Sequence, residues 1–86
     1  MQFDNYAVGQ TIRNLRKAKG ISQDVLSGFA GIARTHLSMI ENGTKQANFE
    51  TIWKIAGALE MQPSELVAKI EETDRKSTRL NSSHRT

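Results

Sequence analysis

The stretch from Ser22 to Gly43, SQDVLSGFAGIARTHLSMIENG, decides the fold of this chain. Ser22 is a strong helix N-cap, because its hydroxyl can accept a hydrogen bond from a backbone N–H in the first helical turn. Gly31 can take the left-handed conformation with which a helix ends and the chain turns sharply. The stretch therefore predicts two short helices, over about residues 23–30 and 33–41, joined by a tight turn.

The second of these helices is predicted to bury one face and to expose the other. Leu37 and Ile40 lie at i and i+3 and can point into a core, while Asn42-Gly43 supplies a stop signal. The polar edge then faces outward, with Arg34, Thr35, His36 and Met39. A rigidly held helix with an exposed polar edge is what reading the DNA major groove requires.

At these residues the sequence resembles the lambda-repressor/Cro-like helix-turn-helix regulators, the Xre family. The similarity covers about residues 6–70 and includes Ile21-Ser22-Gln23, Ala30-Gly31-Ile32, Leu37-Ser38, Ile40-Glu41-Asn42-Gly43, Thr51-Ile52, Ile55-Ala56, Ala58-Leu59 and Ser64-Glu65-Leu66. The resemblance implies an all-α fold, a compact five-helix bundle whose second and third helices form the helix-turn-helix. It also implies double-stranded DNA as a partner, bound by a two-fold dimer.

The resemblance places Arg34, Thr35 and His36 at the positions from which family members reach base edges. The forked donors of Arg34 suit guanine O6 and N7, and Thr35 can offer its methyl or hydroxyl group to a thymine. His36 can donate or accept, according to its tautomer. Met39, one turn later, can contact a thymine methyl group or a sugar, with a partly buried core methionine as the alternative.

A second set of residues is expected at the DNA backbone. The resemblance places Gln23, the first residue of its helix, at a phosphate, and a helix N-terminus is a general anion site. Asn42, Thr44, Lys45 and Gln46 form the loop that lies along the phosphates in the family, where such groups position the protein without reading sequence.

The resemblance also pairs Arg16, near the end of the first helix, with Glu41, which closes the reading helix. A half-buried pair of this kind fixes orientation more than it adds stability. The alternative is two independent surface charges.

Three positions depart from the family pattern. Ala33 stands where Ser or Thr commonly caps the reading helix, and a missing cap costs about 1 kcal/mol. The loop Gln46-Ala47-Asn48 lacks the proline that often precedes the fourth helix. Glu60 occupies a position where glycine usually ends that helix. Gly57, inside the fourth helix, either permits close helix approach across a dimer or simply weakens the helix.

The remaining helices follow from caps and apolar spacing. The first is expected over about residues 6–19, capped by Asp4 or Asn5. Asn48 can cap the fourth, which carries on one side Phe49, Ile52, Trp53, Ala56 and Leu59. Pro63 suits the first position of the fifth helix, whose inward residues are Leu66, Val67 and Ile70.

The length of 86 residues permits one small domain, expected over residues 1–73. The absence of cysteine excludes disulfides and thiol catalysis and suits a reducing interior. Because the chain shows neither a bilayer-spanning apolar run nor a secretion signal, a cytoplasmic protein is expected, with no membrane, metal or cofactor.

Charge divides the chain into three parts. Residues 1–46 carry six basic and three acidic side chains, and residues 47–73 carry two basic and five acidic ones. Residues 74–86 carry four basic residues, one acidic residue and a single apolar residue, so they predict a disordered basic tail. This tail also looks like a translated cloning adaptor and is interpreted as non-native, with a native basic DNA arm as the alternative.

Together these observations predict a sequence-specific DNA-binding transcriptional regulator, such as a repressor, and not an enzyme. It would insert the helix at about 33–41 into the major groove of a palindromic operator as a homodimer. The chain has two histidines and no phosphate-binding glycine loop or metal-spaced cluster. The alternative is an antitoxin-type interaction protein of the same fold, which exposed Ile55, Met61 and Val67 would favour.

Overall fold

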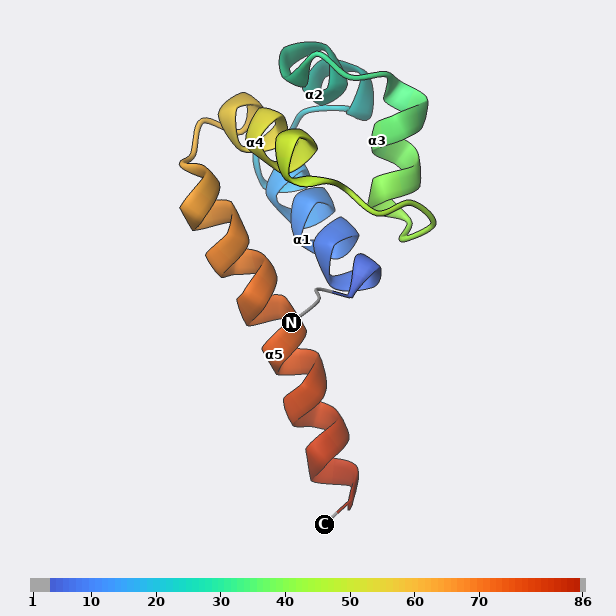
Figure 1. Cartoon of the computed structure of the whole chain (residues 1–86), viewed down its shortest axis with the longest axis vertical. Helices are drawn as coiled ribbons and strands as arrows, with labels where there is room; N and C mark the ends of the chain where they lie inside the picture. Colours follow the sequence, from blue (N-terminus) through green and yellow to red (C-terminus); the bar gives the residue numbers. More distant parts are fainter. Residues whose placement is uncertain (1–3, 86) are drawn as a thin grey trace.

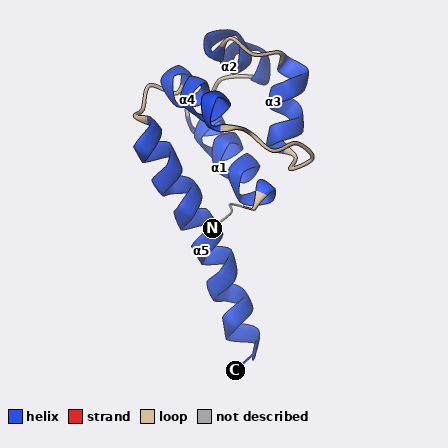
Figure 2. Ribbon diagram, in the orientation of Figure 1, coloured by secondary structure: helices blue, strands red, loops and turns tan. Residues whose placement is uncertain are grey.

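The computed structural model describes residues 4–85, with the side chains placed as far as Lys76. Five helices follow one another in this range: α1 (Asn5–Ala18), α2 (Gln23–Ala30), α3 (Arg34–Glu41), α4 (Phe49–Ala58) and α5 (Pro63–Arg85) (Figure 1). Every regular element in the described range is a helix (Figure 2). The predicted all-α, five-helix fold is therefore confirmed. None of the described helices is long and apolar enough to cross a membrane.

Side-chain caps explain where three of the helices begin. Asp4, Ser22 and Asn48 cap α1, α2 and α4, and their oxygens accept from backbone N–H groups at 3.2, 3.1 and 2.8 Å. Helix α3 begins at Arg34, one residue later than expected, and its N-cap Ala33 makes no side-chain hydrogen bond. The structure therefore confirms that α3 lacks a side-chain N-cap, as the alanine at position 33 indicated.

A left-handed residue follows each of the helices α1 to α4, and the residues after α2 and α4 show two different cases. Gly31 closes α2 with φ 72°, which a glycine takes without strain. Glu60 follows α4 with φ 61°, at the position where the sequence lacks the usual glycine. This conformation costs a non-glycine residue roughly 1–2 kcal/mol. Two backbone hydrogen bonds fix it, from Glu60 N to Gly57 O and from Met61 N to Ala56 O, both at 3.0 Å.

The core lies where all five helices meet. Its largest fully buried side chains are Ile12, Leu26, Leu37, Ile40, Ile55, Leu66 and Ile70. One expectation for α4 is wrong: Phe49 and Trp53 face outward, with 67% and 57% of their surfaces exposed. Ile55, whose exposure would have favoured the antitoxin-type alternative, is completely buried. Helix α4 has apolar residues around its whole circumference, so its sequence pattern did not decide which half would face the core.

Helix α5 is longer than the sequence analysis expected. Its backbone is helical to Arg85 and extends away from the other helices (Figure 1), where the sequence predicted a disordered tail from residue 74. No glycine or proline follows Pro63, and an ion pair of 3.7 Å between Glu71 and Arg75 spans residue 74 on the helix surface. At Thr73 the helix still contacts α1, since the Thr11 hydroxyl donates to Thr73 Oγ1 at 2.8 Å. The non-native origin of the segment stays a prediction.

Candidate nucleic-acid interface

The C-terminal end of α3 is held by a buried ion pair. Arg16 of α1 donates from Nε to Glu41 Oε2 at 2.7 Å and from Nη2 to Glu41 Oε1 at 3.0 Å. The side chains are only 10% and 2% exposed. The hydrogen bond to Glu41 raises the pKa of Arg16 above its ordinary value, against the lowering effect of burial. Arg16 therefore stays charged, and the two residues that the family resemblance paired lie in direct contact.

The same carboxylate also fastens α2. Gln23 donates from Nε2 to Glu41 Oε1 at 3.0 Å, and Arg16 donates from Nη1 to the carbonyl oxygen of Ile21 at 2.9 Å. Glu41 thus joins α3 to both neighbouring helices. The sequence analysis missed this role of Gln23, since nothing in the sequence links residues that lie 18 positions apart. Its predicted contact with a phosphate stays a prediction.

A close backbone contact adds to this anchor. Gly9 of α1 lies directly against the last turn of α3, and a Cβ atom at this position would overlap the carbonyl oxygens of Ile40 and Glu41. Only glycine permits this approach of the two helices. The available signal was a glycine inside a helical pattern, away from any turn, which often marks a packing requirement.

The N-terminal part of α3 is open to solvent. Arg34, Thr35 and Met39 are exposed, and His36 is half-buried. Arg34 forms an ion pair with Asp24 of α2, at 3.2 Å between Nε and Oδ1, and both side chains are more than half exposed. Such an exposed pair contributes about 0–1 kcal/mol. Arg34 can therefore leave Asp24 for a better partner at little cost.

The loop after α3 is a compact turn. Asn42 Oδ1 accepts from the backbone N and the hydroxyl of Thr44, at 3.1 and 2.7 Å, and Gly43 between them has φ 82°. The backbone N of Lys45 donates to the carbonyl oxygen of Met39 at 3.2 Å. Asn42 and Thr44 therefore shape the turn, while the side chains of Lys45 and Gln46 are exposed beyond it.

These residues share one side of the molecule. In Figure 1, α3 and the loop that follows it form the right-hand edge, while α4 and the start of α5 lie toward the opposite side. Residues 1–46, which include α1 and α2 as well as α3, have a net charge of +3, and residues 47–73 have one of −3, when lysine, arginine and the acids are counted. The arrangement presents a firmly held helix whose exposed polar edge carries Arg34 and is followed by Lys45, two cationic side chains that suit a polyanion.

Comparison with known proteins is consistent with this geometry. A protein-family model described as "Helix-turn-helix" matches residues 12–66, which include α2, α3 and the turn between them. The chain belongs to the helix-turn-helix family. The resemblance noted in the sequence is thereby confirmed.

Named relatives of this helix-turn-helix chain are regulators. It is 32% identical over 66 residues to the uncharacterized HTH-type transcriptional regulator y4dJ of Sinorhizobium fredii, covering 77% of this chain and 86% of the relative. It is 38% identical over 60 residues to the control protein C.BamHI of Bacillus amyloliquefaciens, covering 69% and 74%.

Solved structures agree in fold. The restriction-modification controller protein C.AhdI of Aeromonas hydrophila superposes with a TM-score of 0.71 at 38% identity, over 73% of this chain and 96% of that one. The clp gene regulator ClgR of Corynebacterium glutamicum gives a TM-score of 0.86 over 98% of this chain and 89% of the other. At 19% identity, this second likeness concerns the fold alone.

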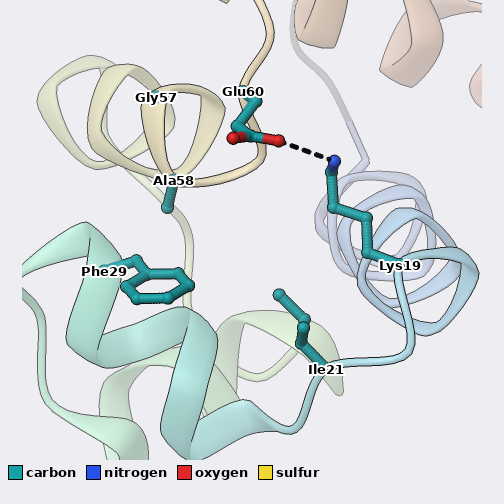
Figure 3. A pocket seen from close by; sticks show the side chains of 6 residues that line it. All are labelled: Lys19, Ile21, Phe29, Gly57, Ala58 and Glu60. Carbon is teal, nitrogen blue, oxygen red and sulfur yellow. Dashed lines mark hydrogen bonds and ion pairs between the residues drawn. The ribbon is translucent and has the colours of Figure 1, made fainter.

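A separate hollow of about 680 Å³ lies where α1, α2 and α4 end (Figure 3). Its walls come from Lys19, Ile21, Phe29, Gly57, Ala58 and Glu60. Lys19 and Glu60 form an ion pair of 3.3 Å across one edge, and the side chain of Ala58 points toward the ring of Phe29. The hollow includes none of the residues predicted to contact DNA.

Proposed function

We propose that this chain is a sequence-specific DNA-binding transcriptional regulator that inserts α3 into the major groove of a palindromic operator as a homodimer. The observation that carries the proposal is the asymmetry of α3, whose last residue is locked by Arg16 while its first turn is exposed. Groove reading needs a helix of fixed orientation with free polar side chains. Family membership and relatives named as transcriptional regulators support the same function. The protein would act in the cytoplasm by binding alone, without catalysis.

The proposed division of labour follows exposure and chemistry. Base edges are contacted by Arg34, Thr35, His36 and Met39, and the sugar-phosphate backbone by Gln23, Asn42, Thr44, Lys45 and Gln46. Since Asn42 and Thr44 bond to each other, they would act by holding the loop backbone against the phosphates. Lys45 supplies the charge, because it is an exposed cationic residue of the loop.

A two-fold dimer fits the size of the reading helix. Helix α3 has eight residues and is therefore about 12 Å long, so it can reach only a few base pairs. Two copies would read two half-sites separated by one helical turn of DNA, and protein symmetry would then match operator symmetry.

The antitoxin-type alternative is not favoured. Exposed apolar side chains at Ile55, Met61 and Val67 would have favoured it, but Ile55 is completely buried, and the other two are half-buried against the core. The relatives reported above are named as regulators and control proteins, not as antitoxins.

The test compares the two kinds of contact on a library of sites. Arg34→Ala should lose roughly 1–3 kcal/mol of binding free energy on the preferred operator and relax one base position. Lys45→Ala should weaken all sequences alike and flatten the salt dependence. Arg75→Ala, which removes an equal charge from α5, is the matched control and should leave the sequence preference unchanged. If the Arg34 and Lys45 variants behave identically across the library, the assignment of roles is wrong.

A further inference from the structure

Helix α4 carries an exposed aromatic stripe for which the single chain provides no partner in the described residues. Phe49 and Trp53 lie one turn apart with 67% and 57% of their surfaces exposed. Their rings pack edge to face, with centroids 5.7 Å apart and an interplanar angle of 64°. Two large rings held in a fixed arrangement but left open to water form a surface of the kind that binds another protein.

The same stripe ends at a glycine, where the helix has no side chain. Gly57 lies one further turn along α4, and a Cβ atom there would meet no atom within 4 Å. Glycine weakens a helix interior relative to alanine, so no contact among the described residues favours glycine at this position. Gly57 lines the hollow of about 680 Å³, together with Ala58 and the ring of Phe29, which is 70% exposed (Figure 3). One end of the stripe is thus a projecting ring, and the other is a socket lined by apolar groups and, at one edge, by the Lys19–Glu60 ion pair.

We infer that two copies of this chain pack α4 against α4 in antiparallel orientation across a two-fold axis at Trp53. In such an isologous contact, the residue four positions before the axis faces the residue four positions after it on the other copy. Phe49 of each copy then enters the hollow beside Gly57 of the other. The inference rests on the proposed function in requiring a homodimer, and it assigns the surface that forms one.

A second copy fits this surface better than an unrelated partner does. The stripe supplies both the projecting ring and the socket, so it is complementary to itself. Glu50 and Lys54, paired at 3.6 Å within one copy, flank the stripe with one charge of each sign. An antiparallel neighbour would bring its Lys54 toward Glu50, and its Glu50 toward Lys54, so the contact creates no like-charge pair along these flanks.

The apolar area that this contact would bury is also of the order expected for a protein–protein interface. Four partly exposed rings, two from each copy, offer on the order of 500 Å² of aromatic surface, about a third of a standard interface. The adjoining groove contributes more, since Pro63 and Val67 at the start of α5 line it together with Phe49 and Trp53. Helix α4 also lies away from α3 in Figure 1, so this contact leaves the proposed reading edge free.

The first experiment measures self-association without DNA. Trp53 is the only tryptophan of the chain, so its emission should shift to the blue as the concentration of the full chain rises and the ring is buried. Sedimentation equilibrium of Trp53→Ala should show a dimer Kd raised by about 30-fold, as expected for a central tryptophan. A chain that remains monomeric at about 100 µM, or a Kd unaffected by Trp53→Ala, would overturn the inference.

The second experiment exchanges ring and socket. Phe49→Ala removes the projecting group and Gly57→Leu fills the socket, so each should raise the dimer Kd by about tenfold or more. Combining them places a leucine opposite an alanine on each side of the axis and should return the Kd to within about threefold of the original value. Gly28→Leu is the matched control, since Gly28 is also a helical glycine with open space around it and should leave the Kd unchanged.

These outcomes separate the interface from the proposed function. All the variants lie at exposed positions, so circular dichroism should show the same helix content, and Gly57→Leu should raise the monomer melting temperature. Failure of the double variant to restore the dimer would overturn the proposed register. Dimerisation through α4 without any operator preference would refute the regulator function while leaving the interface intact.

Discussion

The two ends of α3 differ in almost every physical respect. The C-terminal end has a carboxylate bonded to Arg16 and Gln23, and a glycine of α1 lies against its last carbonyl oxygens. The N-terminal end has no side-chain cap, and its charged residue, Arg34, makes only an exposed ion pair. The helix is therefore fixed from the end opposite the one that carries three of the four proposed base-reading side chains, Arg34, Thr35 and His36. The buried contacts at the C-terminal end fix the orientation of α3, so the exposed side chains of its first turn are free to contact DNA while the helix itself stays rigid.

The largest effect should come from breaking the ion pair at the anchored end. Arg16→Met leaves the carboxylate of Glu41, only 2% exposed, without its charged partner. Removal of one member of a buried pair costs about 3–5 kcal/mol, so the free energy of unfolding should fall by this amount in urea titrations.

Glu41→Gln serves as the partner variant in the same measurement. It should also destabilise the chain, but combined with Arg16→Met the loss should be smaller than the sum of the two single losses. Strict additivity would contradict a direct coupling of the two side chains.

The next effect concerns the backbone contact at the same end. Gly9→Ala places a methyl group against the carbonyl oxygens of Ile40 and Glu41, so the helices must separate. Overpacking of this kind costs about 1–3 kcal/mol, measurable as a lower urea midpoint. Gly28→Ala in α2 is the control, because the new methyl group meets open space and should stabilise the helix by up to about 1 kcal/mol. Equal effects at the two glycines would show that the α1–α3 approach is less close than the structure has it.

Sequence reasoning succeeded where a local residue decides a local outcome. Ser22 and Asn48 cap the helices they were expected to cap, and Gly31 and Glu60 take the left-handed conformations that the turns require. Each of these depends on one side chain or one φ angle within a single turn. For this reason the helix order, the helix-turn-helix and most boundaries could be derived from the chain alone.

Sequence reasoning failed where the direction or the partner of a side chain depends on residues far away in the sequence. The outward direction of Phe49 and Trp53 and the burial of Ile55 depend on which half of α4 meets α2 and α5. The bond between Gln23 and Glu41 depends on how two helices cross. Periodicity contains none of this information.

The smallest effect should come from supplying the cap that the reading end lacks. Ala33 already has the extended backbone of a cap, with φ −69° and ψ 143°, and it stands three residues before His36, as Ser22 stands three before Val25. A hydroxyl at position 33 can therefore accept from the backbone N–H of His36. Ala33→Thr should exceed its isosteric control Ala33→Val by about 1 kcal/mol in unfolding free energy. Since the anchored end is untouched, operator preference should not change. Equal stability of the two variants would mean that the first turn of α3 is not held in the geometry a cap requires.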